Sequence, residues 1–182
     1  MNFNVQIGDI RAVTSEALIT LVNSAGMWFG AVDSIVSRAG GFHRGIGAQR
    51  TEGAVYVTRR EDYDSAAQAP WAHVVFVIDD LTLPLADLVE RGLQAAANAG
   101  CKNVIIPAMR MGVMLNNGPQ DETGLEAKCQ AIIDGVRRVD GLESVTLVVY
   151  SGDPNKDRIF PLCESAASRT SGDGRELRCI QL

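Results

Sequence analysis

The chain has 182 residues, of which 46% are hydrophobic and 21% charged, and its formal net charge is −5. These values are typical of one globular domain and exclude an intrinsically disordered chain. The acidic balance disfavours nucleic acid as a partner, because nucleic-acid-binding domains usually carry a basic surplus.

Strand-like and helix-like segments alternate through the first half of the chain. The first segment alternates apolar and polar side chains with period two and ends at Gly8-Asp9. A later segment has apolar residues at helical spacing and ends at Gly40-Gly41. In chain order, the sequence predicts strands at Phe3–Ile7 and Ala17–Val22, a helix at Val32–Ala39, a strand at Ala54–Thr58 and a polar loop at Asp62–Pro70.

The second half contains the clearest helices. One apolar stripe runs from Leu85 to Ala97, with Gly100 where a helix end is expected, and another runs from Leu125 to Val139. A shorter helix is predicted within Asn155–Ala167, interrupted at Pro161. The other predicted elements are strands at His73–Ile78, Val104–Ile106 and Ser144–Tyr150, a loop at Ala108–Asp121 and a terminal strand at Glu176–Leu182.

Strands separated by helices of about a dozen residues or more are typical of an α/β protein. We therefore predict a three-layer α/β/α sandwich around a mixed, mostly parallel six-stranded sheet. The domain is expected to span residues 1–167, followed by a flexible tail or terminal strand over residues 168–182. In such sheets ligands bind outside the carboxyl ends of the strands. The candidate residues are those that follow Ile7, Val22, Ile106 and Val149.

Cysteine and histidine usage indicates neither a disulfide framework nor a metal site. The four cysteines, Cys101, Cys129, Cys163 and Cys179, are scattered and form no Cys-x-x-Cys motif. We expect reduced thiols in a cytoplasmic protein, with Cys101 and Cys129 buried as small apolar side chains. We expect no metal, since His, Cys and Asp residues are not paired at ligand spacing, and no cofactor. We also expect no membrane span, since no apolar run reaches ~18 residues.

Two loops have features of anion-binding turns. Met111-Gly112-Val113 follows a buried strand, and Gly112 permits close approach of the backbone. Gly30-Ala31-Val32 opens a predicted helix, whose amino terminus favours anions. The main-chain N–H groups of both loops could grip a pyrophosphate without a lysine. Each loop alone is equally well explained as an ordinary strand-to-helix turn.

Two aspartates are candidate functional groups. Asp9 follows the first strand, where its carboxylate can accept a hydrogen bond from an exocyclic amine such as that of adenine, although Asp is also common in turns. Asp33 can orient or deprotonate a water, or simply suit the dipole of its helix. P-loop, Rossmann and nucleophile-elbow motifs are absent.

The order and spacing of these motifs resemble those of macrodomains, which are ADP-ribose-binding modules, over most of the chain. Ile7-Gly8-Asp9-Ile10 resembles the family's Gly-Asp-Ile opening, and Val22-Asn23-Ser24-Ala25-Gly26 its Val-Asn-Ala-Ala-Asn. Phe29–Ile35 resembles its glycine-rich loop and helix start, and Gly53–Thr58 its Gly-x-Ala-x-x-Thr strand. Ile106–Met114 shares its Pro-Ala and a following Gly.

The resemblance implies a role for each matching position. Asp9 would accept from the adenine amine, the Ile10 amide would bond the ring, and Tyr150 or one of its neighbours would flank the base. Asn23 would shape the distal ribose pocket, and Met114 would pack on that ribose. The main-chain cradle of the diphosphate would comprise Gly30, Ala31, Val32, Met111, Gly112 and Val113.

The sequence also departs from the family pattern. Gly26 replaces the second asparagine, which contacts the distal ribose in hydrolytic members, whereas Asp33 matches the catalytic aspartate. Phe29 and Ala31 stand in place of glycines and would crowd the phosphate. Arg110 replaces a small residue, and it either pairs with phosphate, blocks the cleft or points to solvent.

Three functions are consistent with this pattern. The first is binding of ADP-ribose, a related nucleotide or an ADP-ribosylated molecule. The second is hydrolysis of an ADP-ribosyl ester, such as O-acetyl-ADP-ribose or an ADP-ribosylated protein, with Asp33 positioning water; the loss of asparagine at Gly26 argues against it. The third is an interaction module of the same fold that does not bind ADP-ribose, which the altered phosphate loops favour.

Overall fold

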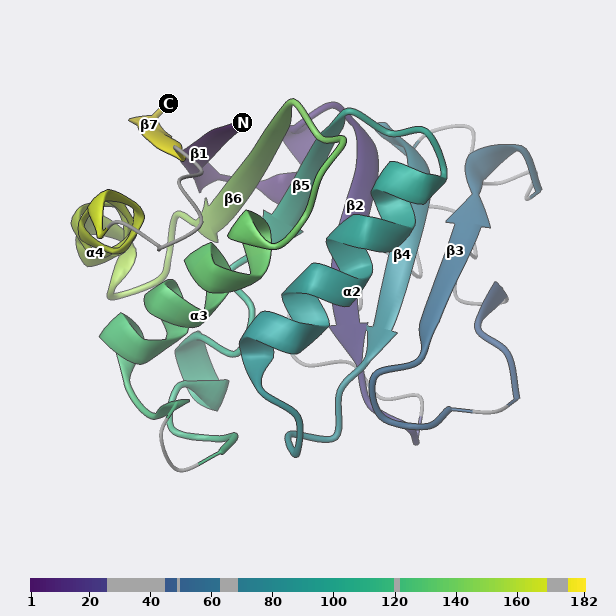
Figure 1. Ribbon diagram of the computed structural model, residues 1–182, viewed down its shortest axis with the longest axis horizontal. Coiled ribbons are helices and arrows are strands. Elements are labelled where there is room, and N and C mark those ends of the chain that lie inside the picture. Colours follow the sequence, from purple (N-terminus) through teal and green to yellow (C-terminus); the bar gives the residue numbers. More distant parts are fainter. Residues whose placement is uncertain (26–44, 49, 63–68, 120–121, 170–176) are drawn as a thin grey trace.

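A computed structural model describes residues 1–25, 45–48, 50–62, 69–119, 122–169 and 177–182 of the chain. Its strands form one sheet in the order β3-β4-β2-β5-β6-β1-β7 (Figure 1). Neighbouring strands are parallel, except for the antiparallel pair β3 and β4. The strands are β1 (Asn2–Gly8), β2 (Ser15–Val22), β3 (Val55–Arg59), β4 (Trp71–Ile78), β5 (Asn103–Pro107), β6 (Ser144–Tyr150) and β7 (Arg178–Gln181).

The predicted α/β class and mostly parallel sheet are confirmed, but the described residues contribute seven strands to the sheet rather than six. The seventh strand is β7, which lies within the terminal strand predicted at Glu176–Leu182 but not counted in the six-stranded sheet. It lies parallel to β1, with Asn2 opposite Arg178 and Val5 opposite Gln181. The Leu182 amide donates to the Val5 carbonyl at 3.0 Å, which extends the contact by one residue. The terminal segment therefore covers the outer edge of β1.

The helices that the structure describes are α2 (Leu85–Asn98), α3 (Leu125–Arg137) and α4 (Lys156–Ser168). Helix α4 runs through Pro161 without a break, so the predicted interruption is wrong. Proline removes one backbone hydrogen bond, but Ile159 and Cys163 are fully buried and hold the helix by packing. The helix predicted at Val32–Ala39 lies outside the described residues. None of the described helices has the length and apolar composition of a membrane span.

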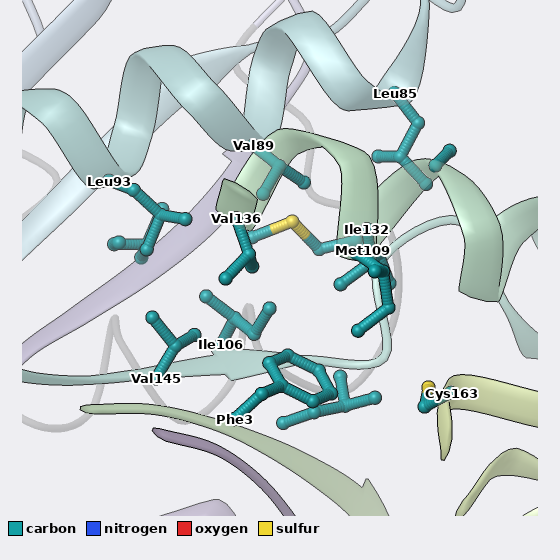
Figure 2. Packing of buried hydrophobic residues seen from close by; sticks show 14 of the residues in the cluster. Phe3, Leu85, Val89, Leu93, Ile106, Met109, Ile132, Val136, Val145 and Cys163 are labelled. Carbon is teal, nitrogen blue, oxygen red and sulfur yellow. The ribbon is translucent and has the colours of Figure 1, made fainter. Parts of the chain in front are cut away.

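Helices α2 and α3 lie side by side across one face of the sheet (Figure 1). Gly135 of α3 permits this approach, because a Cβ there would stand 2.6 Å from the Ala86 carbonyl oxygen of α2. Cys101 and Cys129 are buried, as predicted, and the four cysteines are free thiols. Figure 2 shows the apolar core between the two helices and the sheet, which includes Phe3, Leu85, Val89, Leu93, Ile106, Met109, Ile132, Val136, Val145 and Cys163.

A second apolar cluster lies on the other face of the sheet, because successive strand residues point to opposite faces. Leu18, Val74 and Phe76 belong to it, and each is fully buried. Ile10, in a short 3₁₀ turn after β1 (η1, Ile10–Ala12), is also buried there at 6% exposure. The turn that carries Asp9 is thus anchored to the sheet by its neighbour.

Candidate functional site

The carboxyl ends of β1, β2, β4, β5 and β6 lie at one edge of the sheet, because these strands are parallel. The chain continues from β2 toward β3 and β4 on one side, and from β5 through α3 to β6 on the other side. Neighbouring strands whose connections leave in opposite directions mark the usual ligand position of an open α/β sheet. We therefore take the carboxyl edge around β2 and β5 as the candidate site.

The ladder between β2 and β5 ends before this edge. It pairs Ala17 with Val104 and Leu18 with Ile105, whereas β2 stays paired with β4 as far as Val22, opposite Ile78. The carboxyl ends of β2 and β5 are thus not joined by the described ladder. The loops that follow them can stand apart, as a crevice between them requires.

The turn after β1 carries two of the predicted features, the Asp9 carboxylate and the Ile10 amide. Asp9 precedes the 3₁₀ turn, and its carboxylate accepts a hydrogen bond from the Arg11 amide at 2.9 Å. The Arg11 guanidinium also donates to both carboxylate oxygens. These hydrogen bonds from the Arg11 side chain and amide lower the pKa of Asp9. Ile10 follows with its side chain buried, so its amide is the first of the turn and has no carbonyl partner within it.

Tyr150 lies at the same corner of the edge. It ends β6 opposite Gly8 of β1, one residue before Asp9. Its side chain is 67% exposed. A Cβ on Gly152 would stand 2.5 Å from the Tyr150 ring, so the backbone of this glycine approaches the ring closely. An exposed aromatic residue thus ends the strand paired with β1, level with the residue that precedes Asp9.

The turn after β2 begins with Asn23, which is half-buried at the edge. The Ser24 amide and hydroxyl both donate to Asp80 Oδ1 at 2.9 Å, which ties this turn to the end of β4. Glu52 in turn accepts from the Asp80 amide at 3.0 Å. The other predicted residues of this side, Gly30, Ala31, Val32 and the catalytic candidate Asp33, lie outside the described residues.

The loop after β5 forms a second 3₁₀ turn, η5 (Gly112–Met114). Gly112 is exposed, has φ +64, and leaves open space around the position of a Cβ. Met111 is buried at 7% exposure in the core, and Met114 is half-buried. The Gly112 and Val113 amides come first in the turn, where no internal carbonyl is available to them. Both amides are therefore donors without a carbonyl partner inside the turn.

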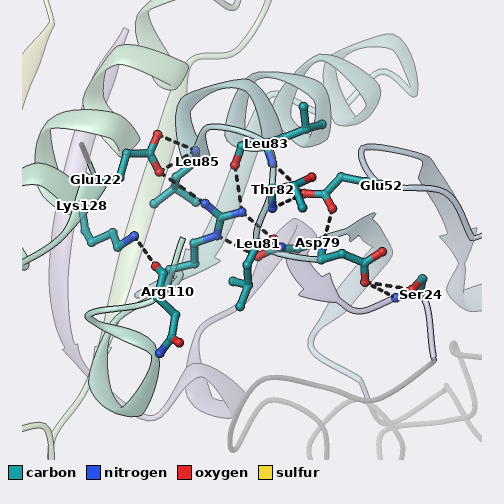
Figure 3. A network of polar contacts seen from close by, with 12 residues as sticks. Ser24, Glu52, Asp79, Leu81, Thr82, Leu83, Leu85, Arg110, Glu122 and Lys128 are labelled. Carbon is teal, nitrogen blue, oxygen red and sulfur yellow. Dashed lines mark hydrogen bonds and ion pairs between the residues drawn. The ribbon is translucent and has the colours of Figure 1, made fainter. Parts of the chain in front are cut away.

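Arg110, predicted as a candidate phosphate ligand, is directed into the protein instead (Figure 3). Its side chain is 1% exposed and forms ion pairs with Asp79 at 2.5 Å and Glu122 at 3.3 Å. It also donates to the Leu83 carbonyl at 3.0 Å. All three guanidinium nitrogens thus donate to acceptors within the protein, so neither phosphate pairing nor the solvent-exposed alternative applies to this structure.

These contacts hold the loop after β5 in place. The Glu122 carboxylate caps the start of α2, accepting from the Leu85 amide at 2.9 and 3.0 Å. Lys128 of α3 is fully buried and donates to the Asn117 carbonyl at 2.8 Å, and burial lowers its pKa. Arg110 has a backbone φ of +53, which is uncommon for a residue other than glycine. The network compensates for that backbone strain.

The sequence analysis missed four of these residues. Asp79, Glu122 and Lys128 form the buried network with Arg110, and Arg11 is paired to Asp9. A signal for Asp79 was present, because it directly follows a strand, as Asp9 does. At the opposite edge, His73 Nδ1 lies 3.6 Å from Cys101 Sγ. Within the described part of the chain, no three His, Cys, Asp or Glu side chains gather as a metal-binding group.

The fold is that of macrodomains. The structure matches a mutant of the Oceanobacillus iheyensis macrodomain with a TM-score of 0.65 and 14% identity, covering 89% of this chain and 88% of that one. It matches the Trypanosoma brucei macrodomain in complex with ADP-ribose with a TM-score of 0.66 and 16% identity, covering 87% and 67%. Another O. iheyensis mutant, with ADPR, gives 0.65 and 14%, covering 89% of both chains.

No known family model matches the sequence, and no curated protein matches it either. At identities of 14–16%, the structural likeness defines the fold and not the activity. The resemblance seen in the sequence motifs is thereby confirmed for the fold, and the chain is a divergent example of it.

Proposed function

We propose that this chain binds ADP-ribose, or a related nucleotide, along the carboxyl edge of its sheet. The observation that carries the proposal is the likeness, over most of the chain, to a T. brucei macrodomain that was solved in complex with ADP-ribose. A function transferred from fold alone is an analogy, so the residues at the edge must support it.

Two regions of the edge support the proposal. Asp9, the Ile10 amide and the exposed Tyr150 ring offer an acceptor, a donor and an aromatic surface, the groups that an adenine base requires. The Gly112 turn offers main-chain amides with no side chain in front of the glycine. The first region suits a base and the second a diphosphate.

Thermal unfolding with ADP-ribose tests the proposal. At ~100 times its Kd, ADP-ribose should stabilise the fold by about 2.7 kcal/mol, a rise in Tm of roughly 5–10 °C for a chain of this size. Asp9→Ala should weaken binding of ADP-ribose far more than binding of ribose 5-phosphate. Glu61→Ala is the matched control, since it removes another exposed, arginine-paired carboxylate, in the 3₁₀ turn η3 (Arg60–Asp62).

Gly112→Val tests the diphosphate region separately. The space around this glycine is open, so the fold should survive, with the backbone strain of a β-branched residue at φ +64. The new side chain would stand in front of the amides, and ADP-ribose binding should be lost. A Tm that does not change in millimolar ADP-ribose would contradict the proposal and favour an interaction module without this ligand.

Hydrolysis of ADP-ribosyl esters stays a prediction from the sequence, because Asp33 lies outside the described residues. If the activity exists, Asp33→Ala should abolish release of ADP-ribose from O-acetyl-ADP-ribose while binding survives.

A further inference from the structure

We propose that Arg11 determines which base the nucleotide site accepts, by competing with the base for the Asp9 carboxylate. The inference rests on the proposed function. The sequence motifs give Arg11 no role, so the argument comes from its contacts.

Arg11 occupies the acceptor positions of Asp9. Oδ1 accepts from the Arg11 amide and from Nε, both at 2.9 Å. Oδ2 accepts from Nε at 2.8 Å and also from Nη2. A carboxylate has about four lone-pair positions, and these contacts account for them. An exocyclic amine can therefore reach Asp9 only by displacing the guanidinium.

The displacement costs little. The side chains of Arg11 and Asp9 are 64% and 41% exposed, and exposed ion pairs are weak and screened by salt. The backbone hydrogen bond from the Arg11 amide to Asp9 Oδ1 does not depend on the side chain. The turn can thus keep its geometry while a base replaces the guanidinium at Oδ2.

The two side chains favour opposite bases. Asp9 only accepts hydrogen bonds, so it selects a base with an amine, such as adenine. A guanidinium only donates, so it selects a base with a carbonyl at the same position, such as hypoxanthine. With both groups at one exposed turn, the site should discriminate weakly between adenine and hypoxanthine nucleotides. Arg11 is then a specificity-determining residue, and its loss should sharpen the preference for adenine.

ADP and IDP, which differ only in the base, are the probes. Calorimetric titration should show that Arg11→Ala binds ADP about two- to fivefold more tightly than the wild type, the range expected for loss of an exposed ion pair. IDP should bind no more tightly, so the ADP-to-IDP affinity ratio rises. At ~1 M salt the gain for ADP should shrink, because the competing pair is screened in the wild type.

Arg59→Ala is the matched control. Arg59 is 62% exposed and pairs with Glu61 at 3.5 Å, so its removal changes the charge equally. It lies opposite His73, near the amino end of β4, and so at the edge of the sheet opposite the candidate site. Its ADP-to-IDP ratio should equal that of the wild type.

Three results would overturn the inference. If Arg11→Ala has the wild-type ratio, Arg11 does not select the base, although nucleotide binding stands. If Arg11→Ala binds ADP more weakly, Arg11 is a direct contact and not a competitor. If neither ADP nor ADP-ribose binds to the wild type or to either variant, the proposed function itself fails, and the inference fails with it.

Discussion

Two arginine–aspartate pairs follow strands at the same edge of the sheet, and they differ in their access to water. In the pair of Arg110 with Asp79, the side chains are 1% and 0% exposed. In the pair of Arg11 with Asp9, they are 64% and 41% exposed. In both pairs, two guanidinium nitrogens donate to the two oxygens of one carboxylate, so the contacts are bidentate. Burial is therefore the variable that separates their effects.

The difference in burial gives the two arginines different roles. A buried pair cannot lose one partner without leaving an uncompensated charge, so Arg110 holds the loop after β5 against β4 and α2. An exposed pair exchanges readily with water, so Arg11 can give up its partner to another donor. The buried pair gives the edge a fixed shape, and the exposed pair leaves part of it adjustable.

The largest expected effect is that of Arg110→Ala. The variant leaves Asp79 buried without its cation, and removing one partner of a buried pair costs about 3–5 kcal/mol. Urea denaturation should show a lower midpoint, and the extrapolated free energy of unfolding should fall by this amount. Arg110→Lys should recover only part, because an ammonium lacks the planar fork that reaches Asp79, Glu122 and the Leu83 carbonyl together.

Arg11→Ala is the comparison for this variant and should leave the urea midpoint where the wild type has it. Equal midpoints for Arg110→Ala and Arg11→Ala would contradict the distinction that burial draws between the two pairs.

A smaller effect is expected for Glu122→Gln, which keeps an oxygen for the Leu85 amide but removes the charge. The variant loses the ion pair with Arg110 and the favourable interaction with the start of α2, a loss of about 1–2 kcal/mol. Glu126→Gln is the matched control, because Glu126 stands in the first turn of α3 and pairs with Arg169 at 66% exposure. An equally large loss of unfolding free energy in Glu126→Gln would show that the burial of Glu122 does not increase its contribution to stability.

Much of the fold could be predicted from the sequence, because strand and helix patterns depend on near neighbours. The stripes that predict α2 and α3 place an apolar residue at every turn, and both helices formed. Pro161 misled the prediction of α4, since burial of Ile159 and Cys163 outweighs one missing hydrogen bond.

The candidate site was only partly predictable. Asp9 and the Gly112 turn follow strand ends, a local signal that the sequence carries. The orientation of Arg110 has no local signal, because its partners Asp79 and Glu122 lie 31 and 12 residues away along the chain. Only the folded chain brings these charges together, so a position facing the predicted cleft turned out to be an internal support.

The smallest expected effect concerns the titration of Asp9. Hydrogen bonds from Arg11 hold the pKa of this carboxyl below its ordinary 3.8. An NMR titration of the carboxyl carbon should therefore give a higher midpoint in Arg11→Ala than in the wild type. High salt should shift the wild-type midpoint in the same direction, because the pair is exposed. A midpoint that neither change moves would mean that Arg11 does not hold Asp9 in solution, and the turn would then offer a free acceptor to any base that reaches it.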